Sequence, residues 1–373
     1  MLKALPRIGT GLMQVEAIEP LALGDSDIAA WHALQASDRT LASPYLTPDW
    51  ARLVNRYRPD ARVVVFRENG NPVGFLPVQL SASSIALPLG GPLCDYQAII
   101  SEPGSVFDGQ KAIEALGVRR IDFTCALADH SATKDHVFIE DHGHIVRFED
   151  GWSAYETERR EAGSQVLKRT RKKMNKFRRE CGNISFHPFV RDDKAFETLL
   201  GWKRTQHRQT GSTDILSRAW IRYVVDAVYQ EQSEEFGGEL FLLRSNDELV
   251  AGLFCIRAGK TLHAWYVGHN HDFDTHSPGL ILFTEAIRAA ADAGFTEMDL
   301  GAGDYRFKQS LANHSRACGP GYIGAGGLSS AWRGMQFGVR QQLESRKMGR
   351  LSLLPGKAMR RLDVWRCMAK SRP

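Results

Sequence analysis

The stretch that decides the fold is "TLHAWYVGHNHDFDTHSPGLILFTEAIRAAADAGFTEMDLGAGDYRFK", residues 261–308. Its composition predicts a strand over 261–270, a loop, a helix that follows Ser277-Pro278-Gly279, and a second strand over 295–300. Ser is a favoured N-cap residue, Pro a favoured first helical residue, and Gly294 stands where a helix C-cap is expected. The sequence therefore predicts one strand–loop–helix–strand unit.

This unit contains one candidate binding feature. A helix N-terminus reached from a strand presents unpaired N–H groups and the positive end of the helix dipole. Residues 277–280 are therefore a candidate site for an anion such as a pyrophosphate. Ser-Pro also starts helices that bind nothing, so the motif alone does not decide the matter.

The segments around this unit are repeated in the first half of the chain. Two helix-like runs precede three strand-like runs in both halves. They are 192–209 and 216–232 before 238–269, and 25–36 and 46–57 before two runs in 61–80 and a third that ends in "LPLGGPLCDYQAII" (87–100). The hairpin "VVVFRENGNPVGFLPVQL" aligns with "LFLLRSNDELVAGLFCIR" after one residue of slippage in the turn. We interpret this as an internal duplication of one αα-βββ-αβ unit.

A basic segment, "SQVLKRTRKKMNKFRRECG" (residues 164–182), joins the two halves. Its apolar residues recur at spacings of three and four, which predicts a helix with one buried stripe: Leu167, Thr170, Met174, Phe177 and Cys181. Lys and Arg occupy most of the rest. Because so many like charges repel one another, we expect the exposed face to meet an anionic ligand.

Composition restricts the class of protein. The 373 residues are 43% hydrophobic and 24% charged, which suits a globular protein of about two domains. The first 20 residues lack the apolar core of a secretory signal. Six cysteines form no CxxC pair, so we expect reduced thiols in a cytoplasmic protein.

Charge is concentrated at the C-terminus. Residues 331–373 hold eleven Lys or Arg and two Asp or Glu, a balance of +9 within a net charge of +5. This tail is expected to form a helical extension that closes the domain; the alternative is peripheral docking on the anionic inner face of a membrane.

A set of motifs occurs in an order that is similar to that of a known family: the basic segment, then "GWKR", "ELVAGLF", "HSPGLILF" and "DLGAGDYRFK". It resembles the GNAT-type acyltransferases linked to cellulose and exopolysaccharide biosynthesis, the CelD-like group, which are relatives of the FemAB peptidyl transferases. "NPVGFLPV" and "LGGPLCDY" resemble the family's degenerate companion unit. The chain lacks the Gln/Arg-x-x-Gly-x-Gly/Ala loop of ordinary GNAT enzymes.

The resemblance implies an α/β (α+β) fold of tandem GNAT-like units, each a mixed, mainly antiparallel sheet flanked by helices. The expected domains are 1–150 (degenerate unit), 151–330 (acyltransferase unit) and 331–373 (basic helical extension). It also implies acyl-CoA as a co-substrate, with no tightly bound cofactor. The acyl-pantetheine arm would lie between splayed strands at 262–268 and 297–303.

Site residues follow from the same resemblance and from acyl-transfer chemistry, which needs a base for the nucleophile and donors for the oxyanion. Asp304 is the candidate base, although a loop Asp also caps turns. Lys308 matches a lysine of the Fem "FKxxF" segment that is associated with substrate binding and catalysis. The donor-binding residues would be Ser277, Pro278, Gly279, Leu280, Gly301 and Gly303. The substrate-binding residues would be Lys203, Trp265, Arg306, Arg169 and Asp95.

Several other polar residues need an interpretation. Asp299 is expected to be a structural acceptor at a strand end. A set of residues resembles metal ligands: His263, His269, His271, His276, Asp272 and Asp274. Because spacing within an irregular loop fixes no geometry, we predict no metal site.

Three functions remain open from the sequence. The first is acyl-CoA-dependent N- or O-acyl transfer to a sugar or amine in polysaccharide or cell-envelope biosynthesis. The second is Fem-like transfer from aminoacyl-tRNA, although no long coiled-coil insertion is present and we do not expect a nucleic-acid partner. The third is a non-catalytic component of a polysaccharide synthase. The sequence predicts no oligomeric state.

Overall fold

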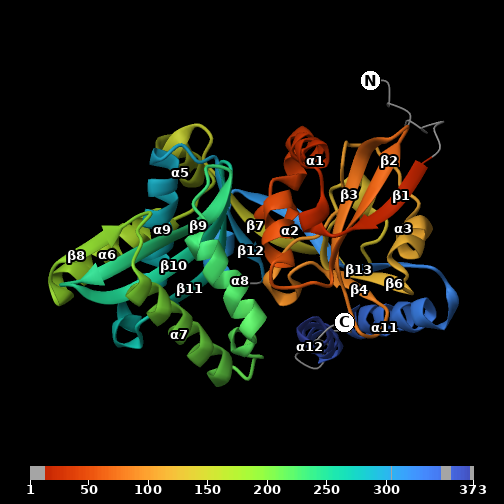
Figure 1. The fold of residues 1–373 in the computed structure, drawn as a ribbon. Helices are drawn as coiled ribbons and strands as arrows, with labels where there is room; N and C mark the ends of the chain where they lie inside the picture. Colours follow the sequence, from red (N-terminus) through yellow and green to blue (C-terminus); the bar gives the residue numbers. More distant parts are fainter. Residues whose placement is uncertain (1–12, 304, 346–353, 370–373) are drawn as a thin grey trace. The chain divides into compact units, whose positions relative to one another are not determined.

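The computed structural model describes residues 13–303, 305–345 and 354–369. The chain divides into two compact units (Figure 1). Unit 1 comprises Met1–His142 and Arg316–Pro373, and unit 2 comprises Gly143–Ser315. The unit boundary after residue 142 lies close to the expected one. The C-terminal residues, expected as a separate extension, cluster instead with unit 1.

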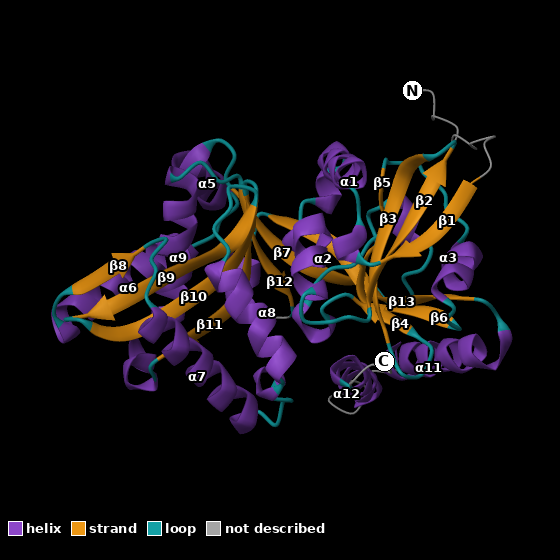
Figure 2. Cartoon of the chain, in the orientation of Figure 1, coloured by secondary structure: helices purple, strands orange, loops and turns teal. Residues whose placement is uncertain are grey.

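The two units repeat one order of elements, strand–helix–helix–three strands–helix–strand (Figure 2). In unit 1 these are β1 (Met13–Ile18), α1 (Asp25–Ser37), α2 (Pro48–Asn55), β2 (Ala61–Glu68), β3 (Asn71–Leu80), β4 (Ala86–Pro88), α3 (Gly109–Leu116) and β6 (Arg120–Leu127). In unit 2 they are β8 (Ile184–His187), α7 (Asp193–Gln209), α8 (Ala219–Gln230), β9 (Phe236–Ser245), β10 (Glu248–Ala258), β11 (Thr261–His269), α9 (Pro278–Asp292) and β12 (Glu297–Ala302).

The remaining elements complete the units. Unit 1 also holds the short β5 (Ile100–Ser101) and α4 (Ser131–Lys134), and the C-terminal helices α11 (Gly327–Ser345) and α12 (Leu354–Met368). Unit 2 also holds α5 (Gly151–Glu161), α6 (Val166–Cys181) and α10 (Arg306–Leu311). Strands β7 (Asp141–Arg147) and β13 (His314–Gly324) cross the unit boundaries in the chain.

Strand pairing is the same in both units. In unit 1, β1, β2, β3 and β4 are antiparallel neighbours, β4 pairs in parallel with β6, and β6 pairs antiparallel with β13. In unit 2, β8, β9, β10 and β11 are antiparallel neighbours, β11 pairs in parallel with β12, and β12 pairs antiparallel with β7. The predicted fold class and duplication are confirmed.

The duplicated hairpins use the same turn. Asn69 and Gly70 have φ of 52° and 84°, and Asn246 and Asp247 have φ of 48° and 75°. Two successive positive φ values are those of a type I′ turn, which favours Asn, Asp and Gly and matches the twist of a β-hairpin. Local turn chemistry therefore sets both hairpins.

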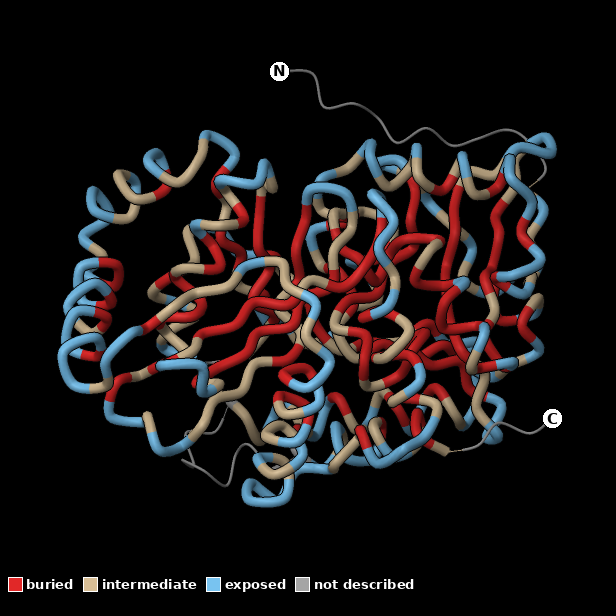
Figure 3. Tube along the Cα trace, turned by 60° about the vertical axis from the view of Figure 1, so that its left-hand side comes forward, coloured by how far each residue is buried: buried red, intermediate tan, exposed pale blue. Residues whose placement is uncertain are grey.

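The core of unit 2 lies between its sheet and helices α6 and α9. Leu167, Thr170, Met174 and Phe177 of α6 are buried, while Cys181 is half-buried, so the predicted stripe is confirmed. Each large apolar side chain removed from water contributes about 1.5–3 kcal/mol before the entropy cost of ordering it. Figure 3 shows the buried residues along the strands and the exposed ones on outer helix faces and loops.

The C-terminal helices join unit 1 through buried polar contacts. Arg333 of α11 is fully buried, and its guanidinium donates to Asp363 of α12 at 2.8 Å. Gln79 of β3 donates to the carbonyl of Cys367 at 3.2 Å. These contacts explain why 316–373 belongs to unit 1. Over the described part of the chain, no helix combines the length and apolarity needed to cross a bilayer.

Candidate functional site

The site is built where two parallel strands of unit 2 separate. β11 and β12 pair at Thr261–Glu297, Leu262–Met298 and His263–Asp299, and their register ends there. β11 continues to His269 and β12 to Ala302. The expected separation of these strands is therefore observed, and it exposes backbone and side chains of β11 to the gap.

A bulge redirects β11 just after the separation begins. Tyr266 pairs with Phe254 and Ala264 with Cys255, which leaves Trp265 as the extra residue. Bulges bend a strand and re-aim its side chains, often beside active sites. Trp265 is half-buried and packs against Phe254, with ring centroids 5.9 Å apart, so the structure gives it a packing role beside the opening.

The start of α9 lies beside this opening. Ser277 is the N-cap residue and Pro278 the first helical residue, as predicted, but Ser277 adopts a left-handed φ of 56° and its side chain caps no helix N–H. Its hydroxyl instead accepts a 2.6 Å hydrogen bond from Lys173 Nζ of α6. The basic helix thus delivers an ammonium group to a helix N-terminus, where dipole and charge both favour an anion.

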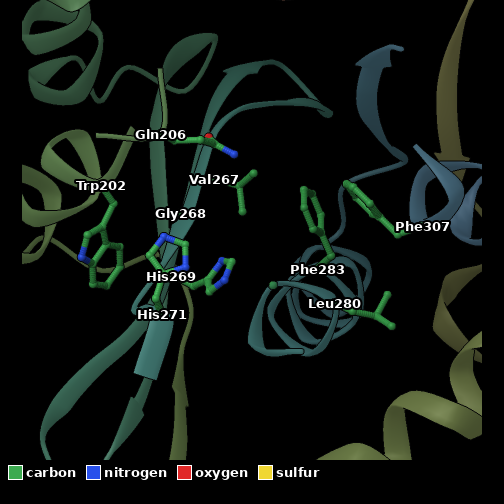
Figure 4. Close-up of a pocket in the computed structure, with 10 residues that line it drawn as sticks. Trp202, Gln206, Val267, Gly268, His269, His271, Leu280, Phe283 and Phe307 are labelled. Atoms are coloured by element: carbon green, nitrogen blue, oxygen red, sulfur yellow. The ribbon is translucent and has the colours of Figure 1, made fainter. Parts of the chain in front are cut away.

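A cavity of about 230 Å³ connects the separated strand with the helix start (Figure 4). Its lining comes from five elements: Trp202, Gln206, Val267, Gly268, His269, His271, Gly279, Leu280, Phe283 and Phe307. Phe283 and Phe307 face each other with ring centroids 5.2 Å apart. A Cβ at Gly279 would meet no atom within 4 Å, so the helix start is open. The cavity is mainly apolar, with polar groups at its rim.

Two lysines mark the end of the site near α10. Lys308 Nζ donates to the carbonyl of Ala302 at 3.0 Å and lies 5.4 Å from the centroid of the Tyr305 ring. Lys203 of α7 is half-buried and donates to Gln206 Oε1 at 3.1 Å. Burial lowers the pKa of Lys203, and the charge of Lys308 lowers it further. Two ammonium groups thus approach each other near the cavity.

Sequence reasoning did not identify His207, one turn beyond Lys203 on α7. Burial lowers the pKa of His207, and the positive charge of Lys203 adds to the effect. Its Nδ1 is buried without a hydrogen-bond partner in the part of the chain that the structure describes. A neutral imidazole of this kind can accept a proton.

The backbone at the end of β12 adopts conformations that explain the glycines there. Gly301 and Gly303 have φ of 73° and 117°, which favours glycine. Asp299 Oδ1 accepts the N–H of Gly301 at 2.7 Å and lies 3.8 Å from His263 Nδ1. Asp299 is thus a buried acceptor that shapes the strand end, as expected. The carbonyl of Gly303 lies 3.2 Å from His144 Nε2.

Of the predicted site residues that the structure describes, Gly279 and Leu280 line the cavity and the others do not. Asp304 lies outside the described residues, so its role as a base remains a prediction. Arg306 and Arg169 are exposed; Lys173, one turn after Arg169 on α6, is the residue that reaches Ser277. Asp95 belongs to unit 1.

The histidines that resemble metal ligands in the sequence lie in two different environments in the structure. His269 Nε2 lies 2.6 Å from Asp274 Oδ1, and His271 Nδ1 lies 3.2 Å from Asp274 Oδ2. These three residues place potential ligand atoms within 4.8 Å of one another, on the exposed rim of the cavity. His276 is instead buried and stacks on Phe177 with centroids 4.5 Å apart. The hydrogen bonds from both histidines lower the pKa of Asp274.

Comparison with known proteins identifies the fold of this region. Residues 164–309 match the acetyltransferase (GNAT) domain family. The match contains α6, α7, β11, α9, β12 and part of α10, and therefore every residue that lines the cavity. Unit 2 is thus GNAT-like at the site itself. No curated protein is a recognisable relative of the whole sequence.

One solved structure supports this fold, and two others are similar at lower scores. The structure of FemX is similar over 85% of this chain and 99% of its own, at 11% identity and a TM-score of 0.54. A tandem GNAT protein from the clavulanic acid biosynthesis pathway covers 85% of this chain and 99% of its own, at 10% identity and a TM-score of 0.49. The C-terminal domain of a lysylphosphatidylglycerol synthetase from Agrobacterium fabrum gives 12% identity, 83% and 94% coverage, and a TM-score of 0.48.

Proposed function

We propose that unit 2 is an acyl-CoA-dependent N- or O-acyltransferase that acts on a sugar or amine acceptor in polysaccharide or cell-envelope biosynthesis. One observation carries the proposal: the separation of β11 from β12 opens into an apolar cavity that ends at the N-terminus of α9, next to Lys173. Acyl-CoA has its chemical groups in the same order, from an apolar acyl end through the pantetheine arm to an anionic diphosphate.

The donor would bind along this axis. The diphosphate would lie at the start of α9, where the helix dipole, the open backbone at Gly279 and the ammonium of Lys173 all favour negative charge. The pantetheine arm would follow β11 beyond the bulge at Trp265. The acyl group would reach Phe283 and Phe307, whose rings exclude water from the thioester.

The acceptor would enter from the side of Lys203 and Lys308. Its amine or hydroxyl attacks the thioester carbonyl carbon; the C–S bond breaks, and the CoA thiolate leaves and takes up a proton. Asp304 or the neutral His207 would accept the proton of the nucleophile. Lys308, held at the carbonyl of Ala302, would stabilise the oxyanion or an anionic acceptor group.

A second candidate is Fem-like transfer from aminoacyl-tRNA. It is favoured by the fold shared with FemX and by the basic exposed face of α6, which would meet RNA phosphate. Such binding would weaken steeply as salt is raised. A gel shift with charged tRNA separates the two candidates: the acyl-CoA proposal predicts no complex at low salt, and a complex would favour the Fem-like reaction.

The experiment for the proposed function is an acyl transfer assay. The full chain is incubated with a panel of acyl-CoAs and with amino sugars and amines, and release of free CoA is measured. We expect turnover with at least one pair, and a larger loss in Lys308→Ala than in its exposed neighbour Arg306→Ala, with unchanged thermal unfolding. Absence of turnover and of acyl-CoA binding across the panel would refute the proposal.

A further inference from the structure

Helix α11 of unit 1 carries a row of apolar residues on its exposed side, in addition to the buried Phe337. Leu328, Trp332, Met335 and Val339 are 91%, 56%, 51% and 46% exposed. They follow one another at spacings of four, three and four residues, so they form a single stripe along about three turns of helix. We call these four residues the α11 stripe. Single exposed apolar residues are ordinary, but a continuous stripe marks an interaction surface.

The opposite face of α11 packs into unit 1, where Phe337 stacks on Phe138 and Tyr322. This face also buries a charged residue, Arg333, which donates to Asp363. Between residues 327 and 342, every residue of the exposed face is uncharged. The stripe therefore lacks the charged residues that normally keep an exposed helix face in water.

Helix α12, which contacts α11, also exposes apolar and basic residues. Trp365 and Leu362 are 61% and 37% exposed, and Arg360 and Arg361 on the same helix are exposed as well. Figure 2 shows both helices at the lower edge of unit 1. Residues 331–373, which include α12 and most of α11, carry a charge of +9 in the sequence.

We propose that the α11 stripe docks in the plane of an anionic lipid bilayer. Charge decides between two candidate partners for this surface, a second copy of the chain and an anionic bilayer. A second copy of this chain would bring +9 against +9, whereas an anionic bilayer attracts the basic segment at about 1 kcal/mol per Lys or Arg near the surface. Tryptophan is also the side chain enriched where headgroups meet acyl chains. An interfacial helix with an apolar face and basic surroundings binds in this way without crossing the membrane.

The inference concerns unit 1 and is independent of acyl transfer by unit 2. It gives a specific surface to the membrane association that the basic tail alone only suggests. The α11 stripe, and not the charge by itself, would hold the helix in the bilayer. Each apolar side chain transferred from water contributes binding free energy in proportion to its buried area.

The test uses the full chain and vesicles of phosphatidylcholine, either pure or mixed with phosphatidylglycerol. Co-sedimentation is compared for wild type, for Trp332→Ser/Met335→Ser, and for a matched control, Leu21→Ser/Val106→Ser, which removes two apolar residues that are 46% and 72% exposed elsewhere in unit 1. All three proteins are compared at one concentration and in one buffer, and because the four substitutions replace uncharged residues, the net charge of the protein is the same in each.

We expect binding to the anionic vesicles, a loss of roughly tenfold for each stripe residue removed, and no change in the control. Acyl transfer to a soluble acceptor and thermal unfolding should be the same in all three proteins. Equal binding of the stripe variant and the control would overturn the proposal, as would equal binding of wild type to pure phosphatidylcholine. So would a wild-type dimer that the stripe variant converts to a monomer without loss of vesicle binding.

Discussion

Replacing Lys173 with methionine is the sharpest perturbation of the donor site. It removes the ammonium that donates to Ser277 Oγ at 2.6 Å and keeps an unbranched side chain that can still pack on α6. A hydrogen bond to a charged group contributes about 1.5–3 kcal/mol. Because Lys173 is only half-buried, solvent screening reduces this to about 1–1.5 kcal/mol. The affinity for CoA should therefore fall about tenfold.

The assay is calorimetric titration of the protein with CoA and, separately, with pantetheine, which lacks the diphosphate. Lys172→Met is the matched control, because Lys172 is the neighbouring residue of α6 but is exposed. Lys173→Met should weaken CoA binding and leave pantetheine binding unchanged, and the difference should shrink as salt is raised. Equal affinities of the two variants for CoA would refute the assignment of Lys173 to the diphosphate.

Three further predictions test other parts of the account. Gly279→Phe should abolish acyl-CoA binding, measured by calorimetry, while the unfolding temperature is kept, because a side chain at Gly279 enters open space at the cavity. Burial and Lys308 lower the pKa of Lys203, so the unfolded chain binds more protons between that lowered pKa and about 10.4. Stability should rise with pH in that window, and Lys203→Met should remove the rise in urea unfolding at several pH values. Arg333→Met removes the hydrogen-bonded partner of the buried Asp363 carboxylate, leaves Arg366 at 3.6 Å from it, and should cost about 3 kcal/mol of unfolding free energy in unit 1.

The sequence was sufficient wherever local chemistry determines structure. The turns at 69–70 and 246–247 need residues that tolerate positive φ, and Asn, Gly and Asp occur there. The stripe of α6 follows from the helical period alone. The strand–helix–strand unit around α9 and the duplication follow from the same local patterns, so the fold class could be predicted.

The sequence was not sufficient where tertiary packing decides which of several similar residues reaches the site. Helix α6 carries many basic residues, and only the packing of α6 on α9 brings Lys173 to Ser277. The same packing turns Ser277 away from the capping role that its position suggests. Phe283 and Phe307 belong to different helices, so their meeting in the cavity depends on tertiary structure.

The unit boundaries show a related limit. A change of charge after residue 330 suggested a separate extension, yet charge says nothing about packing partners. Arg333 and Asp363 bury their charges against each other, and this contact joins the two C-terminal helices within unit 1. The exposure of the α11 stripe could not be read from the sequence either, because an apolar stripe alone predicts burial.

The most direct test of the central claim is hydrogen exchange of the full chain with and without a saturating acyl-CoA. If the donor lies between the separated strands, protection should increase in the second half of β11, over residues 264–269, and in the first two turns of α9, over 278–284. Exchange in β2 and β3 of unit 1 should be unchanged. Saturation without protection at β11 and α9, or no binding at all, would contradict the account.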